Sequence, residues 1–278
     1  MWELLLNSRK FMIGLSIVVV IILLGVIGPM VTLNPNKMNF GALSQAPDTH
    51  FLLGTTQFGE DVFSQLCSSI RNSLMVGAFA GAVGTLIAVF LGALGPYKGG
   101  LADDVSSFVT NVVIVFPVLP MLIVLSAVIV ERTLFLVGVL IALTSWPWAA
   151  RSIRSQVLSL KEREFINLAR MSGMKDRITV VTEVLPNMLA YIMMVFVLLT
   201  GGAIIAEAAI SMIGLGPPHA LTLGQMLYWA MRQTRLAHWW DSWWWFLSPG
   251  IVLTVFLSAV FVMHAGMDEI FNPRLRKM

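Results

Sequence analysis

Residues 11–30 read FMIGLSIVVVIILLGVIGPM, an apolar run without a charged residue. A helix of about 20 such residues is long enough to cross a hydrocarbon core about 30 Å thick. The run follows Arg9-Lys10, exceeds the apolar region of about 7–15 residues found in signal peptides, and precedes no small-x-small cleavage site. We therefore expect a retained membrane span at about residues 11–33.

The rest of the chain repeats this pattern. Hydrophobic residues make up 57% of the sequence and charged residues 12%, whereas soluble domains carry roughly 25% charged residues. The apolar blocks lack the ten-residue alternation of outer-membrane barrels. The sequence thus predicts a single-domain, all-α integral membrane protein with six transmembrane helices, at about 11–33, 74–96, 108–130, 134–151, 187–213 and 248–267. Pro147 is expected to mark a kink in the fourth span or its exit.

The basic residues predict the orientation of the chain, because cytoplasmic loops carry an excess of Lys and Arg. With both termini inside, thirteen of the 18 Lys and Arg residues fall on the cytoplasmic side. We therefore expect a multi-pass protein of the cell membrane with cytoplasmic N- and C-termini. Residues 34–73 and 214–247 would be external, and residues 152–186 cytoplasmic. The net charge of +3 then reflects topology in the lipid bilayer and predicts no nucleic-acid partner.

The second external segment contains HWWDSWWWF at residues 238–246. Tryptophan is enriched at membrane interfaces because its ring is apolar while its N–H needs a polar partner. An interfacial anchor is the favoured interpretation of this cluster. An aromatic platform for a sugar or peptide arriving from outside is the alternative.

Motifs for catalysis are missing from the sequence. It contains no G-x-x-x-x-G-K-[ST] phosphate loop, no H-E-x-x-H zinc helix and no G-x-S-x-G nucleophile elbow. The four histidines show no ligand spacing. We therefore predict that the chain is not an enzyme, has no catalytic residues or metal site, and binds no cofactor itself.

Glu207, in IIAEAAISMIGLG (204–216), is the main ionisable residue inside a predicted span. Such residues are expensive to place in lipid and are functional candidates by default. Glu207 could line a translocation path. The more common alternative is local pairing, or reaching the interface from the outer end of the span.

The cytoplasmic stretch REFINLARMSGMKDRITVVTEVLPN (163–187) is amphipathic. The i, i+3, i+4, i+7 spacing of Phe165, Leu168, Ala169 and Ser172 predicts one apolar or small helical face. Gly173 suits a sharp turn between this helix and a second one at residues 175–183, and Pro186 ends the run. The segment could lie on the inner leaflet or dock into a partner.

Several segments, in this order, resemble one family. REFINLARMSGM (163–174) followed by EVLPN (183–187) is similar to the ATPase-coupling loop of ABC importer permeases. HFLLGTTQFGEDVFSQLCSSIRNSL (50–74), WPWAARSIRSQVLSLKEREF (146–165), AEAAISMIGLG (206–216) and GMDEIFNPRLR (266–276) extend the likeness over most of the chain. The chain thus resembles the C-type permease subunits of dipeptide, oligopeptide and nickel importers.

This resemblance implies the type I ABC importer fold and a heteromeric complex. The expected partners are a second homologous permease, two ATPases that bind ATP and Mg, and an extracytoplasmic solute-binding protein that delivers peptides, nickel chelates or oligosaccharides. The chain would form half of the translocation pathway. The residues that match the coupling loop are Glu164, Phe165, Asn167, Leu168, Ala169, Arg170, Gly173, Glu183 and Pro186.

The sequence departs from the family pattern at four positions. Asn167 replaces the signature Glu, Leu168 replaces its first Ala, Glu183 replaces a His and Glu60 replaces an Arg. The charge contacts of the loop with an ATPase are therefore in question, while its helix and glycine turn are retained. The alternative function is a stand-alone secondary transporter or channel, which the nearly charge-free spans disfavour, and a membrane enzyme comes third.

Overall fold

The computed structural model describes residues 8–233 and 242–271, so Trp239, Trp240 and the predicted C-terminal motif beyond residue 271 lie outside the described residues. Helices make up most of the described chain. Their bounds are α2 (Arg9–Val31), α3 (Val62–Val89), η1 (Phe90–Leu94), α4 (Gly95–Lys98), α5 (Leu101–Val115), α6 (Val118–Val128), α7 (Leu134–Lys161), α8 (Glu164–Met171), α9 (Asp176–Thr179), η2 (Val180–Val184), α10 (Leu185–Asn187), α11 (Leu189–Met212), α12 (Leu223–Gln233) and α13 (Trp243–Phe271). Within these two ranges, five helices are long and apolar enough to cross a membrane, or six if one bent pair is a single span. The predicted all-α membrane fold is confirmed.

Three helices extend beyond the predicted spans, and one of them, expected at 248–267, is α13 at Trp243–Phe271. The helix expected at 74–96 begins at Val62, because the side chain of Asp61 accepts hydrogen bonds from the backbone N–H groups of Phe63 and Ser64 and so caps it. The helix expected at 134–151 continues through Pro147 to Lys161. Hydropathy marks the part of a helix that lipid surrounds, and it gives no signal for extensions with polar side chains.

The third predicted span, 108–130, is not one continuous helix. α5 and α6 meet at Phe116-Pro117 with a bend of 82°. Proline has no backbone N–H and forces the preceding residue toward extended conformations, and Phe116 adopts φ −76° and ψ 129°. This part of the chain is therefore a bent helix pair, α5 and α6, and not one straight span.

The long helices form a bundle in which α3 packs against α7, α11 and α2, and α2 packs along α13. Small residues allow close approach between helices in membranes. At Gly14 of α2, for example, a Cβ would lie 2.6 Å from the carbonyl oxygen of Ala259 in α13. The packing of α2 on α13 therefore needs a glycine at this position.

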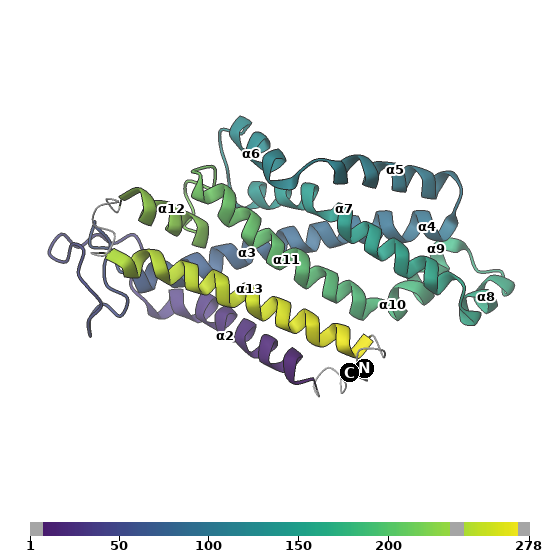
Figure 1. The fold of residues 1–278 in the computed structure, drawn as a ribbon, viewed down its shortest axis with the longest axis horizontal. Coiled ribbons are helices and arrows are strands. Elements are labelled where there is room, and N and C mark those ends of the chain that lie inside the picture. Colours follow the sequence, from purple (N-terminus) through teal and green to yellow (C-terminus); the bar gives the residue numbers. More distant parts are fainter. Residues whose placement is uncertain (1–7, 234–241, 272–278) are drawn as a thin grey trace.

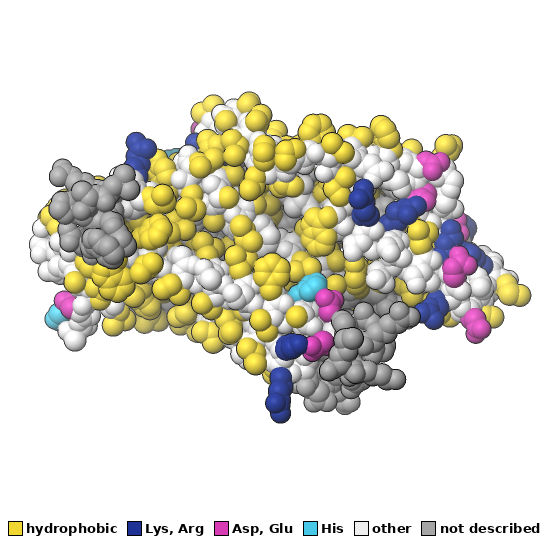
Figure 2. Space-filling model, viewed as in Figure 1, with side chains coloured by type: hydrophobic (Ala, Val, Ile, Leu, Met, Phe, Trp, Pro, Cys, Tyr) yellow, Lys and Arg dark blue, Asp and Glu magenta, His cyan; other side chains and the backbone are white. Residues whose placement is uncertain are grey.

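The bundle is elongated, with α8 and α9 at one end and α12 with the loop before α3 at the other (Figure 1). Hydrophobic side chains cover much of the middle, and charged side chains gather toward the α8 end (Figure 2). This distribution fits a bundle whose two ends lie outside the hydrocarbon core. The start of α2 and the end of α13 lie on the α8 side (Figure 1).

Candidate functional site

The segment at residues 163–187 forms a helical elbow at one end of the bundle. α8 ends with two backbone hydrogen bonds, Met174 N–H to Ala169 O at 3.2 Å and Gly173 N–H to Arg170 O at 3.0 Å. This is the Schellman pattern, whose left-handed position suits glycine. Gly173 has φ +78°, so the structure places the predicted turn at this residue.

The inner face of the elbow differs from the sequence prediction. Ile166 is fully buried and Ala169 nearly so, and Ile166 belongs to a core cluster that also contains Val180 and Val184. Leu168, which the sequence analysis placed on the same face as Ala169, is 66% exposed. The i, i+3 spacing of Ile166 and Ala169 was the sequence pattern that could have predicted the buried face.

The outer face of the elbow exposes apolar side chains among charged ones. Five large hydrophobic side chains are exposed there: Leu168, Met171, Met174, Ile178 and Val181. The elbow projects at the end of the bundle (Figure 1). A row of methionine and aliphatic side chains at such a position is typical of a surface that binds another protein.

A buried tyrosine connects the elbow to the bundle. Tyr97, at the end of the helical run that begins with α3, is 2% exposed. The Arg170 guanidinium carbon lies 5.1 Å from its ring centroid and the Lys161 Nζ lies 5.9 Å from it. Cations over an aromatic face are attracted by its quadrupole. Arg170 therefore ties α8 to the end of α4, as its Nε also approaches the Tyr97 hydroxyl at 3.4 Å.

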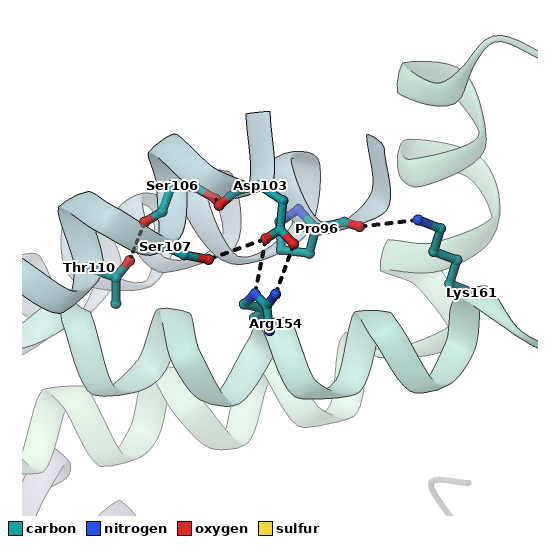
Figure 3. Close-up of polar contacts among 7 residues, drawn as sticks. All are labelled: Pro96, Asp103, Ser106, Ser107, Thr110, Arg154 and Lys161. Carbon is teal, nitrogen blue, oxygen red and sulfur yellow. Dashed lines mark hydrogen bonds and ion pairs between the residues drawn. The ribbon is translucent and has the colours of Figure 1, made fainter. Parts of the chain in front are cut away.

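A salt bridge joins α5, the first helix of the bent pair, to α7. The Nε and Nη2 atoms of Arg154 donate to the two carboxylate oxygens of Asp103 at 3.0 and 2.8 Å (Figure 3). Ser107 donates to the same carboxylate at 3.3 Å, and Lys161 donates to Pro96 O at 3.4 Å. Such two-point contacts between guanidinium and carboxylate fix orientation as well as distance. The end of α7 that leads into the elbow is thus held to α5.

The remaining predicted coupling residues are spread over the elbow. Glu164 and Asn167 are exposed on α8, while Phe165 is half-buried against the core. Glu183 is half-buried, and its backbone carbonyl accepts a hydrogen bond from the Asn187 side chain at 2.7 Å. Pro186 instead lines an apolar groove among α2, α3, α11 and α13. The structure therefore does not bring all nine residues onto one surface.

Glu207 lies at the opposite end, inside the protein. Its Oε1 accepts hydrogen bonds from Ser211 at 2.5 Å and Thr222 at 2.7 Å, and its side chain is fully buried. The Thr222 hydroxyl also accepts from the Gln225 backbone N–H at 3.1 Å and so caps α12. Glu207 lines none of the cavities described below, and its contacts match the local pairing that the sequence left open.

Two of the cavities formed by the described residues share a lining residue. The first, which we call the outer cavity after the predicted external side of the chain, has a volume of about 920 Å³. It is bounded by the loop before α3, the first turns of α3, and α12 with the loop before it. The apolar groove, of about 740 Å³, runs along α2, α3, α11 and α13. Arg71 lines both. In the sequence, Arg71 falls in the predicted external segment at residues 34–73, before the span expected at 74–96, so nothing marked it as a cavity residue.

Two of the four described tryptophans in the predicted second external segment are buried, while Trp229 and Trp243 are exposed. Trp244 donates its indole N–H to Thr55 O at 3.2 Å, and Trp245 lines the outer cavity while being 2% exposed. The expectation of an interfacial anchor is therefore wrong for these two residues. They pack inside the outer end because their rings fill the space between α13 and the loop before α3.

The family of binding-protein-dependent transport system inner membrane components matches residues 84–277. This chain belongs to that family. It is 29% identical over 281 residues to the dipeptide transport system permease protein DppC of Bacillus subtilis strain 168, covering 99% of this chain and 85% of the relative. It is also 29% identical over 257 residues to the oligopeptide transport system permease protein OppC of Mycobacterium bovis, covering 90% and 85%.

The chain is thus a transmembrane permease subunit of an ABC importer, as the resemblance in sequence implied. Permeases of this family are membrane components and not themselves the ATPase. The family description also implies a binding protein as a partner of the transport system.

Proposed function

We propose that this permease forms half of a translocation pathway for peptides and that ATPase subunits drive it through the elbow at residues 163–187. The names of the matched relatives, which are dipeptide and oligopeptide permeases, support the substrate class. In this proposal a second homologous permease completes the pathway, and two ATPases carry ATP and Mg. A solute-binding protein delivers the peptide at the outer end.

The observation that carries the coupling proposal is the division of the elbow into two faces. Ile166 and Ala169 fix its inner face to the core, while Leu168 and Met171 leave its outer face exposed. A partner that grips the outer face would move the inner face with it. Because Arg170 contacts Tyr97, this movement would reach α4 directly, and it would reach α5 through α7, where Arg154 contacts Asp103.

The proposed mechanism is a population shift. ATP draws the two ATPases together, and the elbows move with the ATPases to which they are bound. The spans then exchange between inward-facing and outward-facing arrangements, to the extent that the ATP-bound ATPases bind one arrangement more tightly. In this orientation the elbow and both termini are cytoplasmic, which the excess of basic residues on that side supports.

The test is a double substitution on the outer face, Leu168→Asp with Met171→Asp. Placing two charges in an apolar interface is expected to lower co-purification of the ATPases by tenfold or more, because each buried carboxylate would lack a partner. Leu101→Asp is the matched control, since Leu101 is 83% exposed at the same end but lies outside the elbow.

The two variants give distinct outcomes. Loss of the ATPases from the double variant alone supports the proposal, whereas unchanged co-purification contradicts it. Transport by the purified chain without ATP would instead favour the alternative of a stand-alone secondary transporter or channel.

A further inference from the structure

The outer cavity and the apolar groove meet at one charged residue. Arg71 lines both spaces and is the only Lys or Arg among the described residues that line either one. The outer cavity is otherwise polar on its α3 side, with Gln65, Ser68 and Asn72. Any solute that passes from the outer cavity toward the groove meets this guanidinium.

Arg71 lies below the outer end of the spans. Gly25 of α2 packs beside it, since a Cβ at Gly25 would lie 3.2 Å from the Arg71 backbone nitrogen. Gly25 is six residues before Val31, where α2 ends, and six residues of helix span about 9 Å. A cation at such a depth is costly and marks a functional site by default.

The guanidinium of Arg71 is available to a ligand. Its side chain is exposed in the isolated chain, and among the described residues it has no recorded hydrogen-bond or ion-pair partner. A planar guanidinium matches a carboxylate with two parallel hydrogen bonds. An exposed, unpaired guanidinium at the junction of two cavities is therefore suited to an anionic group.

A negatively charged residue, Glu60, also lies at the outer cavity. Its carboxylate accepts a hydrogen bond from the Gln65 side chain at 2.8 Å. Gln65 and Arg71 are six residues apart on α3, again about 9 Å. An extended peptide spans at most about 3.3–3.6 Å per residue. A zwitterion of two or three residues thus has the length to place its amine near Glu60 and its carboxylate near Arg71.

We propose that Arg71 binds the C-terminal carboxylate of the peptide as it leaves the outer cavity. This inference rests on the proposed peptide function and names a contact within it. The anionic group could otherwise come from a lipid phosphate. The structure favours the peptide because Glu60 and the polar α3 side chains share the cavity with Arg71, and a nearby carboxylate repels an anionic lipid while it attracts an ammonium group.

The test uses the complete importer, purified with its ATPases and binding protein and reconstituted in liposomes. A tripeptide library is supplied as free acids and as C-terminal amides, and the imported peptides are quantified by mass spectrometry. Arg71→Gln is expected to reduce import of free acids roughly tenfold or more, in line with loss of a charged hydrogen bond. It should leave amide import within about twofold. Arg71→Lys should be intermediate, because it keeps the charge but loses the planar fork.

The matched control is Arg232→Gln, which removes the same charge from α12 at a position that does not line the outer cavity. Its import should equal that of the wild type. Each preparation is also tested in phosphatidylcholine alone and with added phosphatidylglycerol.

Three results would overturn the inference. They are unchanged import of free acids by Arg71→Gln, an equal loss for free acids and amides, and a defect that occurs only with phosphatidylglycerol, which would assign Arg71 to a lipid phosphate. A wild-type importer that moves no peptide at all would instead overturn the proposed function. The two failures are therefore distinguishable.

Discussion

The two ends of this permease are held together by different chemistry. At the elbow end, the connecting contacts are charged and partly exposed, as in Asp103 with Arg154 and Arg170 over Tyr97. At the outer end, Glu207 is fully buried and bonded to the hydroxyls of Ser211 and Thr222. Exposed ion pairs are weak and easily exchanged, whereas buried polar networks are costly to disturb.

This difference suits the proposed roles of the two ends, in which the elbow follows the ATPases and the outer end receives the peptide. An element that must follow a moving partner benefits from contacts that can re-form in a second arrangement. A wall of the outer cavity benefits from rigid placement, because α12 presents Gln225 and Trp229 to that cavity. Three sets of substitutions test whether the elbow end transmits motion while the outer end supplies stability.

The largest effect is expected at the turn of the elbow. Gly173→Pro is incompatible with φ +78° and removes the N–H that donates to Arg170 O, a combination that costs about 3 kcal/mol or more. We expect substrate-stimulated ATPase activity of the complex in liposomes to fall by roughly tenfold or more. Membrane insertion should persist, since the spans are untouched.

Gly173→Ala is the graded control for this variant. A Cβ at this position meets nothing within 4 Å, so only backbone strain of about 1–2 kcal/mol remains. Stimulation should then be reduced less than in the proline variant. Normal stimulation with Gly173→Pro would show that the turn does not transmit the ATPase signal.

A smaller effect, of a different kind, is expected at the outer end. Glu207→Ala leaves the hydroxyls of Ser211 and Thr222 without their acceptor and opens a cavity. We expect a loss of about 2–3 kcal/mol in stability, measured as a lower thermal midpoint in detergent. Glu207→Gln should lose less, because it keeps one acceptor oxygen and nearly the same volume.

This pair of variants also separates the two interpretations of Glu207. Reduced stability with proportionate loss of transport fits local pairing. An unchanged thermal midpoint with abolished transport would place Glu207 in the translocation path after all.

The smallest effect is expected at the tie between α5 and α7. Asp103→Asn and Arg154→Gln, alone and together, form a double-mutant cycle. Because both side chains are partly exposed, we expect a coupling energy of about 0.5–1 kcal/mol, and it should shrink at 1 M salt through screening. A coupling energy larger than the stability loss caused by Glu207→Ala would reverse the contrast between the two ends.

Much of the fold could be predicted from the apolar runs, because lipid requires uninterrupted hydrophobic length. The sequence did not reveal that α3 starts at Val62 or that α7 passes Pro147, since those extensions lie where hydropathy gives no signal. The break at Phe116-Pro117 had a local cue in its proline. Its 82° bend depends on how α5 and α6 pack against α7.

The candidate site was predictable in outline. Gly173 was found because a left-handed turn narrows the choice of residue, and the helix before it was found from its periodicity. The division of the elbow into a buried and an exposed face could not be predicted, because periodicity alone cannot say which of two neighbouring apolar stripes meets the core. For this reason the prediction placed Leu168 on the buried face, whereas the structure buries Ile166 and exposes Leu168. Tyr97 and Arg71 could not be found, since their partners and cavities come from distant segments.

Each π-helical segment is followed, one residue later, by a proline. η1 ends before Gly95-Pro96, and η2 ends before Leu185-Pro186. A proline clashes with the carbonyl four residues earlier, and a wider turn moves that carbonyl aside. Such a turn contains an extra residue, and one residue of an α-helix corresponds to about 100° of rotation. η2 therefore rotates α9 relative to α10 compared with a continuous α-helix, and so contributes to the direction in which the exposed side chain of Ile178 points.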